Sequence, residues 1–311
     1  MIHIPDNNLL LFWYGINVSN LRGDAVRLDV KEYYQLEAPL FAGPGLSLRC
    51  NAECNNYIIT QIECREKLQL QELRNNPCCA FLSIAKKPMD EAKNRQGYSF
   101  RISVPSDGDL AFLKRMMVEP FHVPPKLIER LFDVTSVIQN RRNYNTHPIS
   151  GAGFCVKDSE HAYIQLYITN NRDTSAGKIN RLDIDEVFDN TYLLLKSFGF
   201  RCSESEMHDL IKSMYSQEMF AAFYGLDISD SGIEKVKVYF RTTRSLDFDI
   251  LCQTLKELLA QYGKCADLPC WDTVQKTINS KERHYIDCIA IAFKESDGRL
   301  AVDGVQFYLA P

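Results

Sequence analysis

The 311-residue sequence lacks an excess of positive charge. It holds 36 lysines and arginines against 40 aspartates and glutamates, which gives a net charge of -4. A general nucleic-acid binder needs a basic surface to neutralise phosphates, so this class of function is excluded. We expect no nucleic-acid partner, and any site for a polyanion must be local.

Long apolar runs and targeting signals are missing too. No basic segment opens the chain, and the apolar run at residues 9–14 is too short for a signal peptide or a membrane span. We therefore expect a cytoplasmic protein with no membrane partner. The composition, 45% hydrophobic and 24% charged, is that of a globular chain. Its length suits one large domain or two smaller ones, and we predict a single domain over residues 1–311.

The spacing of the cysteines does not suit a metal site. None of the eleven cysteines forms a Cys-x-x-Cys pair, and Cys50 and Cys54 would lie about 13 Å apart on one strand face. The cysteines are predicted to be reduced and mostly buried, and no protein ligand to a metal is assigned. A Ser-His-Asp order, a nucleophile elbow and a glycine-rich phosphate loop are also absent from the sequence.

Residues 232–241 form the most informative stretch that is present. As a strand, this stretch would point Val236, Val238 and Phe240 to one side. The opposite side would carry three cations and a tyrosine: Lys235, Lys237, Tyr239 and Arg241. Solvent exposure would explain such a face, but the same face turned inward would offer hydrogen-bond donors to a polyanion such as diphosphate.

Strand pairs and helices recur along the chain with a period of roughly 70 residues in its second half. Hairpins are predicted at 46–64, 78–104, 153–169, 223–241 and 286–309. Helices are predicted at 65–76, 109–117, 126–132, 184–198, 203–214, 248–262 and 271–278, with one or two short helices within 9–41. This order predicts an α+β fold in which ten antiparallel strands close into a barrel surrounded by helices.

The returning strands share a pattern in which a donor side chain is followed two residues later by a tyrosine. The pattern occurs as Gln165-x-Tyr167, Lys237-x-Tyr239 and Gln306-x-Tyr308, with Arg101-x-Ser103 as a weaker member. Two-residue spacing places both groups on one strand face. Three occurrences in equivalent places favour an inward face, and a ten-stranded barrel is wide enough to enclose a cavity.

This combination of side chains indicates prenyl transfer. Basic and amide groups hold diphosphate by charge-assisted hydrogen bonds, and the candidates are Arg101, Lys235, Lys237, Arg241 and Gln306. Aromatic rings stabilise a cation, such as the one that forms when the carbon–oxygen bond of an allyl diphosphate breaks. The candidates for shielding that cation are Tyr163, Tyr167, Tyr239 and Tyr308.

The hairpins, the Lys237-Val-Tyr239 and Gln306-Phe-Tyr308 strands and residues 34–48 resemble the cyanobactin peptide prenyltransferases, relatives of the aromatic prenyltransferases with the αββα barrel. The resemblance extends diffusely over most of the chain. It implies dimethylallyl or geranyl diphosphate as donor, magnesium as cofactor, and a side chain of a ribosomal, in some cases cyclic, peptide as acceptor. It also implies diphosphate contacts for Arg101 and Lys237.

The chain departs from this family at the expected base. Arg49 stands where the family has a carboxylate on the first barrel strand, and Gln61 replaces its basic partner. The nearest carboxylates on the same faces are Glu53 and Glu63, which we predict to be catalytic bases, with surface carboxylates as the alternative. Such carboxylates would suit an arginine guanidinium as acceptor, and an aromatic residue is the other candidate. A small-molecule aromatic prenyltransferase and a non-catalytic barrel that binds peptide or lipid remain alternatives.

Overall fold

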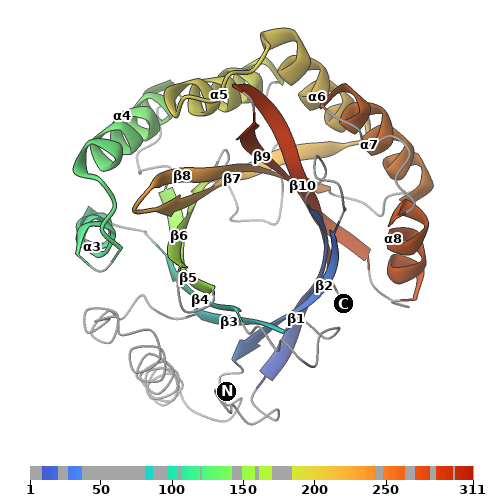
Figure 1. Ribbon diagram of the computed structural model, residues 1–311, viewed down its shortest axis with the longest axis horizontal. Helices are drawn as coiled ribbons and strands as arrows, with labels where there is room; N and C mark the ends of the chain where they lie inside the picture. Colours follow the sequence, from blue (N-terminus) through green and yellow to red (C-terminus); the bar gives the residue numbers. More distant parts are fainter. Residues whose placement is uncertain are drawn as a thin grey trace.

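The computed structural model describes residues 9–19, 27–36, 81–86, 97–103, 107–119, 121–141, 149–157, 161–169, 184–242, 248–262, 270–280, 285–296 and 298–310. Within these residues the strands form a closed barrel in the order β1-β10-β9-β8-β7-β6-β5-β4-β3-β2 (Figure 1). Every neighbouring pair is antiparallel. Such closure leaves no sheet edge exposed.

The strands are β1 (Leu9–Ser19), β2 (Arg27–Leu36), β3 (Phe81–Lys86), β4 (Gly97–Ser103), β5 (Ile149–Lys157), β6 (His161–Thr169), β7 (Met219–Ser229), β8 (Gly232–Thr242), β9 (Tyr285–Ser296) and β10 (Arg299–Ala310). Consecutive strands pair as hairpins, and β1 closes the barrel by pairing with β10. The sequence-predicted hairpins near β3–β4, β5–β6, β7–β8 and β9–β10 are confirmed.

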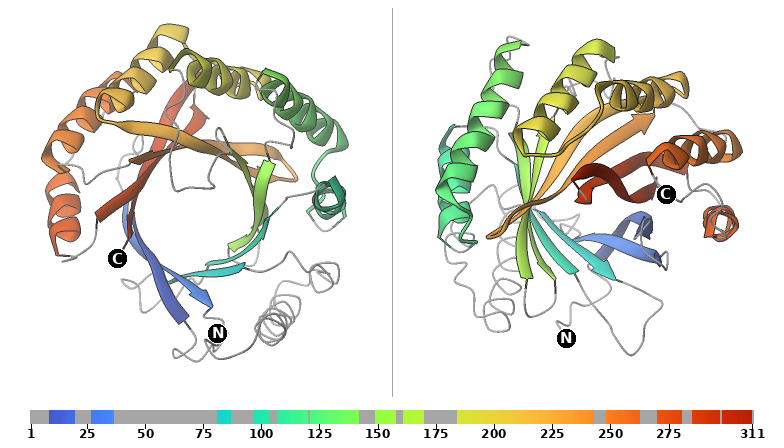
Figure 2. Two further views of the ribbon diagram at one scale, coloured as in Figure 1. Left: turned by 180° about the vertical axis from the view of Figure 1, so that it is seen from behind. Right: turned by 45° about the horizontal axis from the view of Figure 1, so that its top comes forward.

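The helices lie outside the barrel, and Figures 1 and 2 show them as an arc along one side of it. They are α3 (Asp107–Val118), α4 (Pro125–Arg141), α5 (Ile184–Ser197), α6 (Glu204–Ser216), α7 (Phe248–Tyr262) and α8 (Cys270–Asn279). Each has an apolar stripe; on α6 it consists of Met207, Leu210, Ile211 and Met214, all fully buried. This spacing is that of an amphipathic helix packed on a sheet.

The main hydrophobic core fills the space between these helices and the outer faces of the strands. On β6 every second residue belongs to it, namely Ile164, Leu166 and Ile168, none of which is exposed. A buried polar contact joins the two layers, because the hydroxyls of Thr191 on α5 and Tyr224 on β7 lie 2.9 Å apart. The inward faces of the strands are therefore free to carry different chemistry.

One sequence prediction needs correction. The short helices expected within 9–41 are wrong, since β1 and β2 lie there. The buried Ile16 and Val18 alternate along β1 with a period of two, and they pack in the main core. The predicted hairpin at 46–64 and the helix at 65–76 lie outside the described residues. An antiparallel barrel flanked by helices is thus confirmed, but its strands are not the ten that were predicted, because β1 and β2 take part in it.

None of the described helices combines the length and the apolar character that a membrane crossing requires.

Candidate active site

The two faces of β8 lie in different environments. Val236, Val238 and Phe240 are fully buried in the main core beneath the helices. Tyr239, on the opposite face, belongs to a second and separate cluster inside the barrel. Because side chains alternate along a strand, Lys235, Lys237 and Arg241 share this inward face.

The second cluster, called here the interior aromatic cluster, consists of Trp13, Tyr167, Phe223, Tyr239 and Tyr308 with small neighbours from β9. The rings of Phe223 and Tyr239 stack, with centroids 4.3 Å apart and planes 19° apart. Tyr239 lies between Tyr167 and Tyr308, with centroid distances of 6.2 and 6.0 Å. Trp13 packs edge-on against Tyr308 at 5.3 Å. These rings come from five strands and form one continuous aromatic wall.

Backbone pairing arranges the inward residues in rows around the barrel. The first row of Cα partners is Arg101, Gly153, Gln165, Asp227 and Lys235. The second is Gly151, Tyr167, Gly225, Lys237 and Ala292. The third is Phe223, Tyr239, Ala290 and Gln306. Charged and amide side chains dominate the first row, and rings dominate the third, so polarity changes along the barrel axis.

Small residues make room for the large ones within these rows. A Cβ atom built on Gly225 would lie 2.9 Å from Cε2 of Tyr239, closer than two carbon atoms pack. The Tyr239 ring therefore rests directly on the backbone of β7. A glycine at this position allows the stacked geometry of the interior aromatic cluster.

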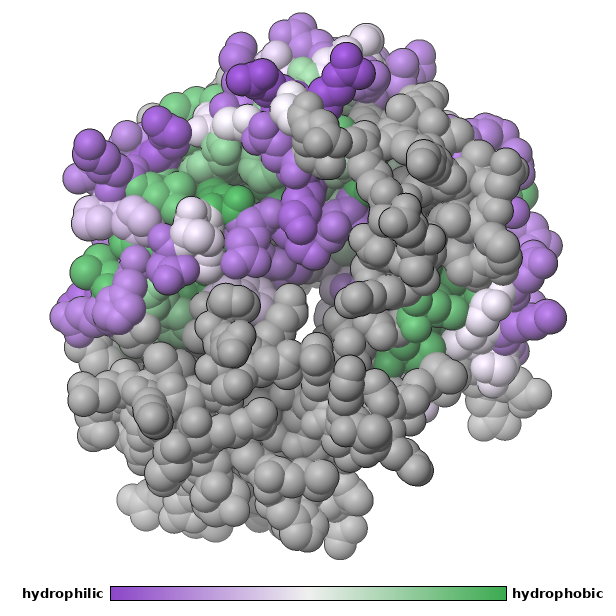
Figure 3. Space-filling model, in the orientation of Figure 1, coloured by the Kyte–Doolittle hydropathy of each residue, from purple (hydrophilic) through white to green (hydrophobic). Residues whose placement is uncertain are grey.

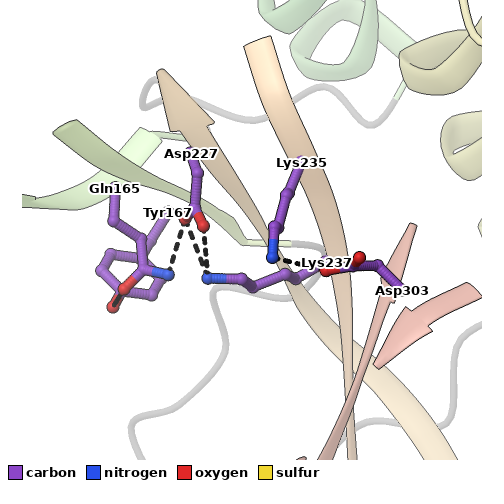
Figure 4. Close-up of polar contacts among 6 residues, drawn as sticks. All are labelled: Gln165, Tyr167, Asp227, Lys235, Lys237 and Asp303. Atoms are coloured by element: carbon purple, nitrogen blue, oxygen red, sulfur yellow. Dashed lines mark hydrogen bonds and ion pairs between the residues drawn. The ribbon is translucent and has the colours of Figure 1, made fainter. Parts of the chain in front are cut away.

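A polar network begins where the aromatic wall ends (Figure 4). Lys237 Nζ lies 2.9 Å from Oδ1 and 2.7 Å from Oδ2 of Asp227. Gln165 Nε2 also donates to Asp227 Oδ1, at 2.9 Å, and the Tyr167 hydroxyl donates to Gln165 Oε1 at 2.5 Å. The Asp227 side chain is only 4% exposed. The network orients the lysine, the amide and the phenol relative to one another.

Two further ion pairs involve the inward face of β8. Lys235 Nζ reaches past β9 to Asp303 on β10 at 2.5 Å, as Figure 4 shows. Arg241 donates to Oδ1 of Asp287 on β9 at 2.6 Å. The pKa of Arg241 is raised, because the hydrogen bond and charge of Asp287 outweigh the opposing effect of burial. Each cation of this face thus has an aspartate partner.

The structure brings together most of the predicted site residues that it describes. Lys235, Lys237, Tyr167 and Tyr239 lie on inward faces of neighbouring strands. Tyr308 joins the same cluster from β10, and the half-buried Gln306 pairs with Ala290 of β9. Tyr163 is half-buried on β6, two residues before Gln165. The roles assigned to these residues remain predictions.

Other predicted residues are placed less completely. The backbone of Arg101 belongs to the first row, opposite Gly153. Arg241 lies on the inward face but four residues beyond Lys237, with Tyr239 between them. Glu53 and Glu63, together with the departures at Arg49 and Gln61, lie outside the described residues.

Asp227, Asp287, Asp303 and Trp13 are among the interior residues that the sequence analysis missed. Asp227 falls on a predicted strand opposite Lys235, so pairing the hairpin residue by residue would have found it. Asp287 and Asp303 lie at irregularities of the β9–β10 pairing, where strict alternation fails. Trp13 was not recognised as an interior residue, because short helices were predicted within residues 9–41 where β1 lies.

The described residues do not offer a ready-made magnesium site. Among them, no group of three or more histidine, cysteine, aspartate or glutamate side chains is arranged to hold a metal ion. The interior aspartates are paired with cations instead.

Seen along the direction of Figure 1, the space-filling surface has an opening at its centre, and hydrophilic described residues border it on one side (Figure 3). The opening lies over the barrel interior that holds the polar network. A ligand entering there would meet charged groups and aromatic rings.

Comparisons with known proteins support the fold. No protein-family model matches the chain, and no curated protein matches it. Among solved structures, PriB bound to product diphosphate has a TM-score of 0.58 at 10% identity, covering 96% of this chain and 79% of that chain. AnaPT from Neosartorya fischeri has a TM-score of 0.54 at 10% identity, covering 96% and 77%. The 6-dimethylallyltryptophan synthase from Micromonospora olivasterospora has 0.53 at 12% identity, covering 96% and 81%. At such low identity the likeness concerns the fold, and this chain has the antiparallel barrel fold of these prenyltransferases.

Proposed function

We propose that the protein is a prenyltransferase that moves a dimethylallyl group from its diphosphate to an acceptor inside the barrel. The observation that carries this proposal is the position of Lys237 next to Tyr239 on an inward face, where a lysine ammonium group adjoins the interior aromatic cluster. The fold supports it, since a solved structure of PriB with a similar fold is a ternary complex with L-tryptophan and dimethylallyl thiolodiphosphate. Geranyl diphosphate is the alternative donor.

The donor diphosphate would bind at the polar end of the interior. Lys235 and Lys237 supply ammonium groups, and Arg101 belongs to the same end by its strand pairing. Gln306 adds an amide from the third row. Charge-assisted hydrogen bonds from such groups to phosphate oxygens are among the stronger ones in proteins. Magnesium would enter bound to the diphosphate, because it is commonly held through substrate phosphates and few protein groups.

The chemistry would proceed by heterolysis. The bond between the allyl carbon and oxygen breaks, and its electron pair leaves with the diphosphate. The rings of Tyr167, Tyr239 and Tyr308 shield the allyl cation. Tyr163, four residues before Tyr167 on β6, is a further proposed shield. Tyr239 is only 3% exposed, which keeps water from capturing the cation. The acceptor nucleophile then bonds to the allyl carbon and gives its proton to a base.

Glu53 and Glu63 are the proposed bases. Glu53→Gln or Glu63→Gln should abolish transfer to arginine-containing peptides while leaving donor binding unchanged, because a glutamine cannot take the proton. Full activity of both variants would contradict this assignment.

The acceptor would enter from the side of Arg241 and Asp287. Arg241 lies about 13 Å along β8 from Lys237, with the Tyr239 ring between them, so we assign it to the acceptor end and not to diphosphate. Asp287 would exchange its partner for the guanidinium of an acceptor arginine. A peptide side chain, arginine or aromatic, is the proposed acceptor, in line with the resemblance to cyanobactin enzymes.

A free aromatic amino acid is a second candidate acceptor. The Micromonospora olivasterospora structure is a complex with Trp, and the interior aromatic cluster here would stack on an indole ring as readily as on a peptide side chain. Both candidates use the same donor site. A peptide acceptor requires space for its backbone near Arg241, whereas a free amino acid requires space only for a small molecule.

The decisive experiment is incubation with dimethylallyl diphosphate and magnesium. The acceptors are linear and cyclic peptides containing arginine, tyrosine or tryptophan, together with free L-tryptophan and simple phenols. The readout is a mass gain of one prenyl unit. Lys237→Gln should lower transfer on the order of a hundredfold, whereas Lys212→Gln, a matched change of an exposed lysine on the outer helix α6, should leave it unchanged.

The outcomes separate the alternatives. A gain only on peptides supports the peptide enzyme, and a gain only on tryptophan or phenols supports a small-molecule enzyme. Donor binding without transfer to any acceptor would support a non-catalytic barrel. Equal activity of Lys237→Gln and the unmodified protein would overturn the donor site. A parallel reaction with a chelator tests the requirement for magnesium.

A further inference from the structure

Each cation on the inward face of β8 is neutralised by an aspartate from another strand. The partners of Lys235, Lys237 and Arg241 come from β10, β7 and β9 respectively. Three positive and three negative charges balance in these pairs. A site that holds diphosphate is expected to carry surplus positive charge, so the balance calls for an explanation.

We infer that Asp227 is an internal counter-ion that pairs with Lys237 in the free protein, loses this partner when Lys237 turns to the donor diphosphate, and regains it when diphosphate leaves. This inference rests on the proposed function and deepens it. The ligand class is a diphosphate anion. Asp227 would weaken diphosphate binding and speed the release of the diphosphate product.

The contacts explain why Lys237 cannot serve both anions unchanged. Its Nζ lies within 2.9 Å of both carboxylate oxygens of Asp227, so the ammonium group is directed at that carboxylate. The lysine side chain is 15% exposed and the aspartate 4%. Phosphate oxygens approaching Lys237 must therefore either displace Asp227 or lie close to its negative charge, which costs free energy in this partly buried setting.

Asp227 can lose Lys237 without losing all its contacts. Gln165 Nε2 donates to its Oδ1 at 2.9 Å, and Tyr167 fixes Gln165 from the other end. The carboxylate is thus held in place on β7 by the amide. Lys237 has a flexible four-carbon stem that lets the ammonium swing. Lysine movement between a fixed carboxylate and an incoming diphosphate is the two-state element.

An orienting role for Asp227 would have the opposite effect. If the carboxylate served to hold Lys237 ready for the donor, its removal would weaken diphosphate binding. The counter-ion role predicts tighter binding after removal. The sign of the change in diphosphate affinity therefore decides between the two roles, and a change in the stability of the fold does not decide between them.

The test is calorimetric titration of the full chain with inorganic diphosphate and with dimethylallyl thiolodiphosphate. Asp227→Asn keeps the shape and removes the charge, and we expect about ten- to a hundredfold tighter binding. Asp227→Glu keeps the charge, and Asp230→Asn makes the same charge change on an exposed residue of the β7–β8 turn. Asp230→Asn should stay within about threefold of the unmodified protein, which is less than 1 kcal/mol, and Asp227→Glu should show no tighter binding.

Product release is the second measurement. Fluorescence of Trp13 in the Trp271→Phe background reports on the interior, because Trp271 is buried outside the barrel and these are the two tryptophans of the chain. In stopped-flow displacement, the dissociation rate of diphosphate from Asp227→Asn should fall by the same factor by which its binding affinity rises. A merely structural residue would not slow this step.

Three results bear on the outcome. Unchanged or weaker diphosphate binding by Asp227→Asn would overturn the inference while the donor site stands. No diphosphate binding by the unmodified protein would overturn the inference and the proposed function together. If the variant is unstable, a crystal structure of the unmodified protein with diphosphate decides: Lys237 Nζ more than about 4 Å from Asp227 supports the inference, and a retained ion pair without phosphate contact refutes it.

Discussion

Replacement of Gly225 by alanine tests the packing of the interior aromatic cluster. The added Cβ atom would lie 2.9 Å from Cε2 and 3.5 Å from the hydroxyl of Tyr239. Tyr239 cannot move away freely, because it is 3% exposed and stacks on Phe223 at 4.3 Å. Among the described glycines, the positive-φ conformation is confined to Gly199, Gly232 and Gly298. The cost at position 225 is therefore steric.

The size of the effect follows from two opposing contributions. Overpacking a filled interior costs about 1–3 kcal/mol. Replacing glycine by alanine lowers the conformational entropy of the unfolded chain, which stabilises the folded protein by about 0.4–1 kcal/mol. We expect a net loss of about 1–2 kcal/mol for Gly225→Ala. In a chain of this length such a loss lowers the unfolding midpoint by only a few degrees, roughly 2–4 °C.

Gly153→Ala is the matched control on the neighbouring hairpin. Its added Cβ atom would make ordinary contacts, the nearest at 3.7 Å to Gln165 and Tyr167. We expect Gly153→Ala to be neutral or slightly stabilising. Thermal and urea unfolding, followed by near-ultraviolet circular dichroism, measure both variants against the unmodified protein.

A double-mutant cycle locates the clash. In a Tyr239→Ala background the ring is gone, so Gly225→Ala should no longer destabilise the protein. The reasoning is refuted if Gly225→Ala proves as stable as Gly153→Ala, or if its cost persists after the ring is removed. Under the proposed function Gly225→Ala should also slow prenyl transfer, because the displaced ring shields the cation less well.

Three further predictions concern the rest of the described chain. Thr191→Val removes a buried hydroxyl that bonds the Tyr224 hydroxyl at 2.9 Å and should lower the free energy of unfolding by about 1–2 kcal/mol in urea titrations; no loss would contradict the role of this contact. Burial raises the pKa of the Cys252 thiol to about 12, so this thiol should resist iodoacetamide at pH 8. Its contribution to the free energy of unfolding is fully present below pH 9, which is about the pKa of the thiol in the unfolded chain. This contribution should be lost as the pH rises from about 9 to about 12, and urea titrations at several pH values measure the loss. Arg241→Gln leaves the buried Asp287 carboxylate without its ion-pair partner and should destabilise the protein, and adding Asp287→Asn should restore stability in the same unfolding assay.

Local periodicity explains what could be predicted from the sequence. The alternation over Gly232–Thr242 depends only on neighbouring residues, and it separated Val236 and Val238 from Lys237 and Tyr239 correctly. The spacing of donor and tyrosine on the returning strands placed Tyr167, Tyr239 and Tyr308 in one cluster. Hairpins with short turns are local as well, which is why four of them were located.

Features that depend on distant pairing or on irregular backbone could not be predicted in the same way. The β1 strand is held by β10 and β2, and its own residues gave an ambiguous pattern. Asp303 follows Val302 at a register shift, so strict alternation misassigns its face. The charge balance of the interior therefore became apparent only from the paired strands.

The pairing of β1 with β10 also has a kinetic consequence. Tyr14 lies opposite Leu309, almost the whole chain away in sequence, and contacts of such long range are slow to form because loop closure costs entropy before any contact rewards it. On the ribosome, the β5–β6 and β7–β8 hairpins can form early, while the pairing of β1 with β10 must wait until β10 has been synthesised. The polar interior stays open to solvent until β1 and β10 pair, and the rate of this pairing is expected to set the folding time of the barrel.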